Sequence, residues 1–538
     1  MPSDGMPAPG ASGAAAGAGD RLLRNTLANV VGRFWAIGLT LVLTPYIVSR
    51  VGLERFGLWS LISVLTGYVA LLDFGLGTAF IKRLAEYRAR GDGKRINETV
   101  ATGFAAHLAI GVVTGVAALL FAGAITRLLD VPPPLVAEAR VVLGWGLVLF
   151  TVGNASSVFP SLVVACQRMD LTNRIAIVIT VPQAIATVLV LEAGWGLRGL
   201  LLVQALVTLA GVGANVVVAH QLVPGLGLSP RWVRWRAYRD LMSFGMKLQA
   251  VKISDILTFQ TDRLILARFW GMAPVGFYQL GSMVAVKVRQ MPLLLTSAVL
   301  PLASELSTLG ERERLVSLYE RGTRYLVAVG LPLSAAAAVL ARPLFRAWMG
   351  AGYEASATIL QILAAGYFAN MMHGQAVLIG AALDRPGLHT RSAALTAVVN
   401  VILSVALGLT FGYVGIAVAT TIALVLGPLY YLPLFHRLLG TPLGPFFRRL
   451  FIAPVIATAA ASAAAALAAR AAGALPIGAV RLAGIAETVA GSIVFAALYV
   501  IILWRLGYVT VADRELAARA IRFGLNAPAD LAGAGSGR

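Results

Sequence analysis

Long apolar runs, separated by short polar segments, occupy most of the chain. A helix needs about 20 mainly apolar residues to cross a bilayer, and runs of this length recur along the sequence. The strands of a membrane barrel would instead alternate apolar and polar residues, and these runs do not. The pattern predicts an all-α integral membrane protein with about fourteen transmembrane helices. The expected spans lie near residues 27–48, 57–78, 100–122, 141–164, 175–193, 197–219, 241–268, 275–302, 322–341, 356–380, 391–410, 413–435, 450–471 and 482–504.

The segment 241–270 is long enough to span a bilayer, yet it is the least hydrophobic of the fourteen. On a helix its polar side chains fall within an arc of roughly 160°. They are Gln249, Lys252, Asp255, Gln260, Asp262 and Arg263, and the next span adds Lys287 and Arg289 near its middle. A charged side chain facing lipid at mid-bilayer costs roughly 2.5–3.5 kcal/mol. These groups must therefore face a water-filled cavity or one another, which predicts a transporter built around this polar face.

Composition and charge narrow the class of protein. The chain is 58% hydrophobic and only 13% charged, whereas about 25% of the residues of a soluble domain are charged. A formal net charge of +20 would suit nucleic acid, but Lys and Arg lie in short loops between apolar spans, which is the topology signal of a membrane protein. No nucleic-acid partner is expected. Cys166 is the only cysteine and the five histidines have no ligand-like spacing, so we expect no metal site and no cofactor.

The charges of the loops also predict an orientation. Lys and Arg crowd the second loop, around residues 82–95, and the sixth, around 231–239. The even loops carry more of these residues than the odd loops do. Basic loops stay on the cytoplasmic side of the membrane. Because an even number of spans places both ends on one side, both termini are expected in the cytoplasm.

Short motifs recur at a nearly constant spacing, which indicates an internal repeat. Residues 51–59 (VGLERFGLW) align without gaps on 270–278 (WGMAPVGFY), 219 residues further along, and Glu86 meets Glu305 at the same spacing. Residues 167–168 meet 384–385, and 196–199 meet 412–415, at spacings of 217 and 216. Six spans per repeat is an even number, so the halves share one orientation about an axis along the membrane normal. The repeat predicts two six-helix lobes, followed by two C-terminal helices, with a cavity between the lobes.

This repeat divides the chain into six expected parts. They are a disordered N-terminal tail (1–20), an N-lobe (21–220), a cytoplasmic interfacial linker (221–240), a C-lobe (241–437), two further helices (438–508) and a cytoplasmic tail (509–538). The linker segment 230–240 (PRWVRWRAYRD) places Trp and Tyr among arginines. This pattern is typical of an interfacial helix on an anionic leaflet.

Basic side chains within the spans are the candidate binding groups. Arg33, in the first span, falls opposite Lys252 under the repeat, so each lobe offers a cation at equivalent depth. The alternative role for each is a structural ion pair or a side chain that snorkels to water. We expect a cationic cavity lined by Arg33, Lys252, Lys287, Arg289 and Arg263.

Three acidic residues have two possible roles each. Asp255 and Asp262 either couple transport to H⁺ or Na⁺ or neutralise neighbouring Lys and Arg. Asp73, just before Phe74-Gly75, either caps the inner end of its helix or takes part in function. The sequence leaves the coupling ion open.

The first ninety residues also carry the motifs of a known family. In order they are RN (24–25), LTPY (43–46), VGLERFGLW (51–59), LLDFGLG (71–77) and LAE (84–86). They resemble the opening of the Wzx-type oligosaccharide flippases, the polysaccharide biosynthesis proteins of the multidrug/oligosaccharidyl-lipid/polysaccharide superfamily. The resemblance implies a transporter, not an enzyme, that moves a polyprenyl-diphosphate-linked oligosaccharide to the outer leaflet of the bacterial inner membrane. It also implies membrane lipids, glycosyltransferases and a polysaccharide polymerase as partners.

The residues favour this cargo over three alternatives. A diphosphate needs cations held in a cavity, and basic side chains supply charge-assisted hydrogen bonds. A lipid II flippase of the MurJ type would carry an equally anionic cargo. A multidrug antiporter of the MATE type would favour an acidic, aromatic cavity. A membrane polymerase or ligase would need a sizeable outer loop with catalytic residues, and the odd loops are short.

Overall fold

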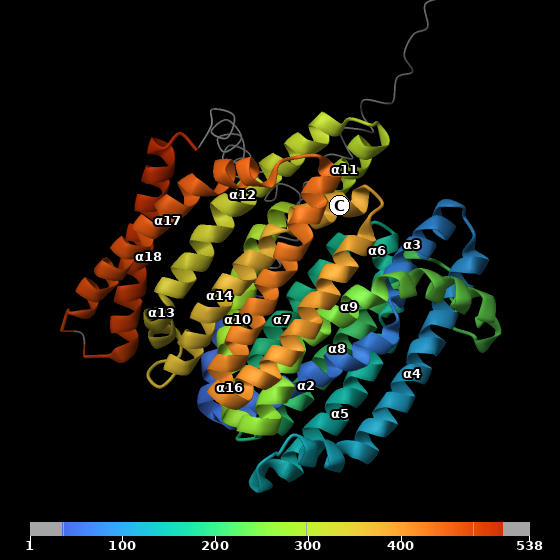
Figure 1. Ribbon diagram of the computed structural model, residues 1–538. Coiled ribbons are helices and arrows are strands. Elements are labelled where there is room, and N and C mark those ends of the chain that lie inside the picture. The colour runs from blue at the N-terminus through green and yellow to red at the C-terminus, as the bar shows by residue number, and fades with distance from the viewer. Residues whose placement is uncertain (1–34, 36, 297–298, 477, 509–538) are drawn as a thin grey trace, which may run out of the picture. The chain divides into compact units, whose positions relative to one another are not determined.

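The computed structural model describes residues 35, 37–296, 299–476 and 478–508. Within these ranges the regular structure is helical and contains no strand (Figure 1). In the described part of the chain, eleven helical segments are long and apolar enough to cross a membrane, and a shorter apolar helix, Ile37–Val51, precedes them. The prediction of an all-α, multi-pass membrane protein is confirmed, while the count of fourteen spans stays a prediction.

The described helices form two compact units. Unit 1 runs to Leu280 and also takes in Ala393–Ala423, whereas unit 2 holds Gly281–Ser392 and the chain from Leu424 onward. This division differs from the expected lobes, because the middle of one long helix packs with the first unit. The two-lobe division from the repeat stays a prediction.

Unit 1 places its core where several short and long helices meet. Its elements after Ile37–Val51 are α2 (Leu53–Ala70), η1 (Leu71–Asp73), α3 (Leu76–Ala89), α4 (Gly93–Leu128), η2 (Pro133–Leu135), α5 (Val136–Ala155), α6 (Val158–Ala165), α7 (Met169–Glu192), α8 (Gly196–Leu222), η3 (Pro230–Trp232), α9 (Trp235–Trp270), the start of α10 (Met272–Leu293) and the middle of α16 (Pro386–Leu439). A buried cluster around Phe80, Phe159 and Leu241 joins α3, α6 and α9. α5 contacts α2, α4 and α8.

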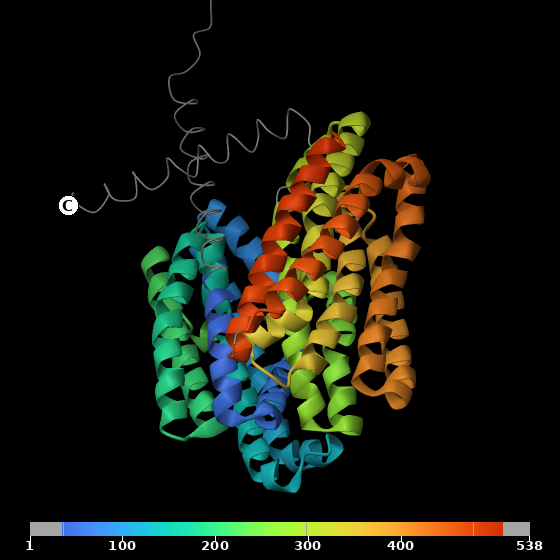
Figure 2. The same cartoon turned by 90° about the vertical axis from the view of Figure 1, so that its left-hand side faces the viewer.

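Unit 2 is built from the remaining helices. They are the rest of α10, η4 (Leu294–Thr296), α11 (Val299–Thr308), α12 (Arg312–Val339), α13 (Ala341–Trp348), α14 (Glu354–Met372), α15 (Gly374–Ala382), the two ends of α16, α17 (Leu443–Gly473) and α18 (Val480–Arg505). Tyr319, Phe435 and Phe446 form an aromatic core between α12, α16 and α17. α17 and α18 run side by side in both views (Figures 1 and 2). Small residues allow α17 and α18 to pack closely, since Gly491 faces the carbonyl oxygen of Ala465.

Several expected spans contain a break in the helix. The span 57–78 breaks after Asp73, 141–164 at residues 156–157, and 356–380 at His373. Conversely, the spans 391–410 and 413–435 meet within α16 at Gly412, whose φ of 62° and ψ of −144° favour glycine. Broken helices at membrane depth are tolerated only where protein or a water-filled cavity surrounds the backbone. The breaks therefore point to sites away from lipid.

The expected interfacial helix at 230–240 is not a separate element. Ser229 caps the short turn η3 by accepting a hydrogen bond from the Arg231 N–H at 3.3 Å, and α9 begins at Trp235. Arg234 ties this start to α4, because its N–H donates to Thr102 Oγ1 at 2.9 Å. No proline or glycine follows before Gly245, so the helix continues into the span. Residues 235–240 of the expected linker are therefore the first residues of α9.

Unusual backbone conformations recur at the spacing of the sequence repeat. Three matched pairs share a positive φ: Gly52 and Gly271 (85° and 83°), Gln167 and Asp384 (60° and 58°), and Gly196 and Gly412 (53° and 62°). The pair of non-glycine residues carries the most weight, because L-residues rarely adopt positive φ. The agreement supports local equivalence between the copies, and the axis relating two six-helix halves stays a prediction.

The two copies of the first motif also contact each other within unit 1. A Cβ at Gly57 would meet the backbone of Met272 and Gly276, and a Cβ at Gly276 would lie 2.7 Å from the carbonyl oxygen of Leu53. Residues 53 and 272 are matched positions, as are 57 and 276. The contact is therefore reciprocal, which is what a two-fold axis produces.

Candidate functional site

A helix break positions Asp73. α2 ends in the 3₁₀ turn η1, and two left-handed residues, Phe74 (φ 48°) and Gly75 (φ 76°), separate it from α3. The Asp73 carboxylate accepts a hydrogen bond from the N–H of Gly77, in the first turn of α3. The break thus turns the Asp73 side chain out of α2, and its carboxylate caps the start of α3.

Two glycines bring this break against α9. A Cβ at Gly75 would lie 2.6 Å from the carbonyl oxygen of Gly245, and a Cβ at Gly245 would lie 2.9 Å from the carbonyl carbon of Gly75. The backbones can approach this closely only without side chains. Gln249 and Lys252 follow Gly245 by one and two helical turns, so the crossing places the polar face of α9 beside Asp73.

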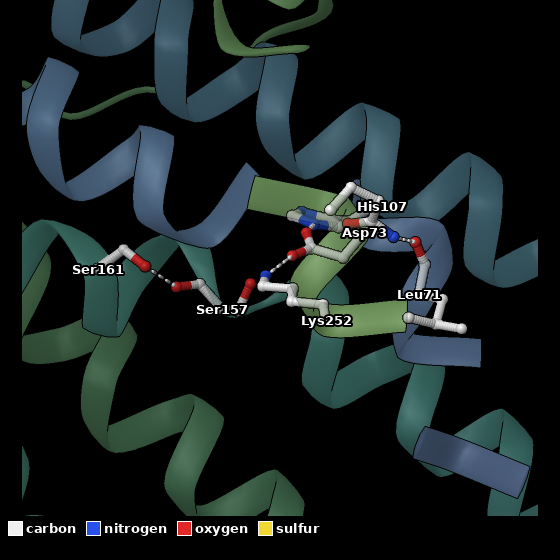
Figure 3. Close-up of polar contacts among 7 residues, drawn as sticks. Leu71, Asp73, His107, Ser157, Ser161 and Lys252 are labelled. Carbon is white, nitrogen blue, oxygen red and sulfur yellow. Dashed lines mark hydrogen bonds and ion pairs between the residues drawn. The ribbon is translucent and has the colours of Figure 1, made fainter. Parts of the chain in front are cut away.

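Asp73 is the centre of a polar cluster from three helices (Figure 3). Its Oδ2 lies 3.7 Å from the Nζ of Lys252, and its Oδ1 is bonded to the Nε2 of His107 from α4. Gln249 donates to the carbonyl oxygen of Leu71 at 2.5 Å, which satisfies a backbone acceptor freed by the break. His107 is buried, whereas the Lys252 side chain is 42% exposed. The buried His107 therefore fixes the Asp73 carboxylate on one side, and the carboxylate pairs with the accessible Lys252 amine on the other.

This arrangement suits the binding of an anion. The Asp73 carboxylate lowers the cost of a charged amine within the predicted span 241–268. An ammonium group has three N–H donors, and Asp73 can take only some of them. The accessible side of Lys252 remains available for a phosphate or carboxylate oxygen.

A second cluster in unit 1 surrounds Asp262, which is 2% exposed. Its Oδ2 accepts hydrogen bonds from Tyr278 at 2.5 Å and from Thr420 at 2.7 Å, and its Oδ1 accepts from Ser404 at 3.2 Å. Asn400 completes the shell, because its Nδ2 donates to Oδ1 of Asp262 at 3.4 Å and its Oδ1 lies beside the hydroxyl groups of Ser404 and Thr420. The hydrogen bonds to the Asp262 carboxylate come from uncharged groups, and Arg263, the next residue of α9, interacts with it electrostatically. Neutralisation of a basic neighbour and ion coupling both stay possible roles of Asp262.

The Asp262 cluster consists of oxygen atoms and one amide. A buried carboxylate among neutral oxygens is a suitable place for a proton or a hard cation, both of which oxygen atoms hold well. No group of three or more His, Cys, Asp or Glu placed to hold a metal ion occurs in the described part of the chain.

The remaining predicted site residues occupy separate places. Asp255 is exposed on α9, and Arg263 bonds to Gln260 of the same helix at 3.1 Å. Lys287 and Arg289 are half-buried in the part of α10 that belongs to unit 2, where Arg289 lies over the ring of Tyr367. Arg33 lies outside the described residues. A cavity onto which all five cations converge stays a prediction.

Sequence reasoning missed His107 and the hydroxyl groups around Asp262. His107 lies alone in an apolar run of α4, and an ionisable residue inside a span is a functional candidate by default. That signal was present in the sequence. Asn400 and Ser404, four residues apart, share a face of an otherwise apolar helix. Their partner Asp262 lies about 140 residues away in the chain, which no local pattern shows.

Known proteins resemble the chain in sequence. A family model described as polysaccharide biosynthesis protein matches residues 51–358. The uncharacterized membrane protein EpsK of Bacillus subtilis is 23% identical over 424 residues, which cover 76% of this chain and 82% of EpsK. The probable low-salt glycan biosynthesis flippase Agl15 of Haloferax volcanii is 22% identical over 422 residues, which cover 75% of this chain and 81% of Agl15.

Solved transporter structures share the fold. The lipid II flippase MurJ, in an inward closed conformation, matches with a TM-score of 0.68 at 13% identity, over 90% of this chain and 99% of MurJ. An inward-facing multidrug resistance MATE transporter matches with a TM-score of 0.59 at 14% identity, over 77% and 94%. Because the family model covers more than half of the sequence, the chain belongs to the polysaccharide biosynthesis protein family of multi-pass membrane transporters.

Proposed function

We propose that the protein is a flippase for a polyprenyl-diphosphate-linked oligosaccharide, the repeat unit of a surface polysaccharide. It moves this cargo from the inner to the outer leaflet of a bacterial cytoplasmic membrane by alternating access. The main support is an accessible amine within a membrane span, Lys252, held beside Asp73. The description of the family and the name of the Haloferax volcanii relative indicate glycan as the cargo.

The geometry suggests how the diphosphate is held. The Lys252 Nζ lies 3.7 Å from the Asp73 carboxylate, which the bond to His107 fixes in place. A diphosphate carries more negative charge than one carboxylate, and its oxygens form strong charge-assisted hydrogen bonds with an ammonium group. The amine therefore exchanges Asp73 for the diphosphate and returns to Asp73 when the cargo leaves.

The rest of the cycle follows the two-lobe architecture. The lipid tail stays in the bilayer, and rocking of the halves moves the opening of the site from one side to the other. Arg33, Lys287, Arg289 and Arg263 complete the cationic lining in this scheme. Glycosyltransferases supply the cargo on the cytoplasmic side, where both termini lie, and a polymerase consumes it outside.

Coupling to H⁺ or Na⁺ is assigned to Asp262. This carboxylate is buried among neutral oxygens, whereas Asp255 is exposed and Asp73 already has a cationic partner. Binding of one H⁺ or Na⁺ would neutralise the Asp262 carboxylate, which joins α9, α10 and α16. A change in the packing of these helices would then accompany binding of the ion.

Lipid II is the second candidate cargo. MurJ covers 90% of the chain in the structural comparison, and its named cargo is also a lipid-linked glycan. The cationic site alone does not separate the two. Restoration of growth to cells depleted of their lipid II flippase would favour this second cargo, whereas restoration of surface polysaccharide to cells without the chromosomal gene favours the first.

The test of the proposal is the variant Lys252→Ala. We expect loss of surface polysaccharide and accumulation of lipid-linked oligosaccharide on the cytoplasmic face, at a normal level of the protein in the membrane. Lys252→Arg should retain part of the activity because it keeps the charge. The readout is the protection of the lipid-linked oligosaccharide from a sugar-oxidising reagent that does not cross the membrane of spheroplasts.

Lys94→Ala is the matched control, because Lys94 is exposed at the start of α4, away from the cluster. It should leave surface polysaccharide unchanged. Full activity in Lys252→Ala would remove the basis of the proposal. So would an accumulated oligosaccharide that the reagent reaches, because this would place the defect after translocation.

A further inference from the structure

Unit 1 contains an uncharged pocket between α2, α5 and α8. Its volume is about 500 Å³, within the range of roughly 300–1,000 Å³ that small-molecule sites occupy. None of the described residues that line it is charged. Two aromatic side chains, Trp59 and Phe150, share the lining with six polar ones: Ser63, Thr66, Asn154, Ser157, Gln204 and Thr208.

The polar lining follows the helical period on each of the three helices. α2 contributes Ser63 and Thr66, three residues apart, and α8 contributes Gln204 and Thr208, four residues apart. α5, which contacts both helices, contributes Asn154 in its last turn, and Ser157 follows directly before α6. Side chains three or four residues apart share one face of a helix. Three such faces turned toward one space form a built site rather than scattered polar residues.

The chemistry of this lining selects the class of ligand. The Asn154 side chain makes no hydrogen bond within the described part of the chain, and that of Gln204 only a long one, of 3.4 Å, to Thr208. Each amide offers both donors and an acceptor, which is what a sugar hydroxyl requires. The aromatic rings offer apolar faces for the C–H side of a sugar ring. An acyl chain would leave the amides unsatisfied, and an anion would find no cation.

The pocket adjoins the anion-binding cluster. Ser157 lines the pocket and is also drawn in the cluster of Asp73 and Lys252, on the side of the amine (Figure 3). Its carbonyl oxygen accepts a hydrogen bond from Ser161 at 2.8 Å, which fixes the start of α6. Thr66 precedes Asp73 by seven residues, or about 10 Å along the helix axis. Ser157 is thus the residue through which a ligand bound at Lys252 would reach the pocket.

We infer that this pocket is the saccharide subsite and binds the sugar attached directly to the diphosphate. The inference rests on the proposed function and deepens it, because it separates two tasks. Lys252 binds the group common to all lipid diphosphates, and the pocket distinguishes a loaded lipid from the empty carrier. Asn154 and Gln204 are the specificity-determining residues, with Trp59 as the stacking surface.

The test compares two ligands on the full-length protein in lipid nanodiscs. One is a short-chain prenyl diphosphate, and the other is the same compound bearing one hexose or N-acetylhexosamine, taken from a panel of both kinds. We expect the wild-type protein to bind at least one sugar-bearing ligand more tightly. Asn154→Ala and Gln204→Ala should each reduce this preference by up to about tenfold, without changing the affinity for the sugar-free ligand. Trp59→Leu should reduce it, and Trp59→Phe should restore it.

Two controls separate this inference from the proposed function. Gln183→Ala removes a glutamine from α7, outside the pocket, and should leave the preference unchanged. Lys252→Ala should weaken both ligands equally. Equal binding of the two ligands, with loss of both in Lys252→Ala, would overturn the saccharide subsite and leave the flippase proposal intact. If Lys252→Ala binds both ligands as tightly as the wild-type protein does, the proposed flippase site itself is overturned. Pocket variants that weaken both ligands equally would also overturn the subsite, since they would show a structural role.

Discussion

Asp73 connects three helices through one carboxylate, since it caps α3, bonds to His107 of α4 and lies beside Lys252 of α9. A buried carboxylate with one polar partner would be costly in a membrane span, whereas one with several partners is stable. The same atoms that stabilise the break thus orient the amine. Of the two roles that the sequence left open for Asp73, the contacts show a structural one, and its part in transport stays a proposal.

Asp262 supports a prediction about coupling. Asp262→Asn removes the carboxylate charge and places an amide donor either toward the hydroxyl donors of Tyr278 and Thr420 or toward that of Ser404. We expect transport to lose its dependence on an imposed H⁺ or Na⁺ gradient, and stability to fall by about 1–3 kcal/mol from the unsatisfied donors. Ligand translocation in proteoliposomes with and without each gradient measures the first effect, and thermal unfolding measures the second.

Asp255→Asn is the control for this change, because Asp255 is an exposed aspartate on the same helix. It should retain the gradient dependence of the wild-type protein. If Asp262→Asn still responds to the gradient that drives the wild-type protein, the coupling charge lies elsewhere.

The elements of the site are positioned by close helix crossings more than by side-chain contacts. Gly245 of α9 meets the backbone of Phe74 and Gly75 at the α2–α3 break. Gly245→Ala would push a methyl group into this backbone, and the atoms that it would meet are backbone atoms of Phe74 and Gly75, which a side-chain rotation cannot move. We expect a loss of about 1–3 kcal/mol in the free energy of unfolding and reduced surface polysaccharide, because Lys252 would move away from Asp73.

The matched control is Gly213→Ala in α8, where an added Cβ would meet nothing within 4 Å. This change should be neutral or stabilising by up to about 1 kcal/mol, because alanine favours the helix. Thermal unfolding of both variants, purified in the same detergent, tests the pair. Equal stability of the two variants would mean that the α9 crossing adjusts without cost.

The period of the α9 sequence predicted which of its side chains share a face, but not what they contact. Lys252 and Asp262 both fall on the predicted arc, yet the structure places them in different clusters. Hydrophobic periodicity describes one helix at a time, whereas the partners of Lys252 and Asp262 come from η1, α10 and α16. The break at Asp73 also escaped prediction. Its Phe74 adopts a left-handed φ that local sequence disfavours and the packing against Gly245 maintains.

At the scale of the whole molecule, the internal repeat stays a prediction that local backbone geometry supports. Matched residues share positive φ values, and the motifs around Gly57 and Gly276 contact each other reciprocally. Backbone geometry is retained after side chains diverge, because a glycine or a strained turn restricts substitution more than an apolar span does. The division into units 1 and 2 instead depends on which helices pack against one another. The order of apolar and polar residues along the chain does not specify this.

The predicted orientation of the whole molecule has a direct test in the lone cysteine. Cys166 is buried at the end of α6, so Cys166→Ser gives a background without cysteine at little cost in volume. Single cysteines are then introduced as Lys94→Cys, at the exposed start of α4, and as Ala193→Cys, in the exposed turn after α7. Basic loops are retained in the cytoplasm, and the segment 82–95 is among the most basic of the chain. A membrane-impermeant maleimide should therefore label position 193 in intact spheroplasts and position 94 only after lysis. Labelling of position 94 before lysis would invert the orientation, and with it the direction of transport proposed for the cargo.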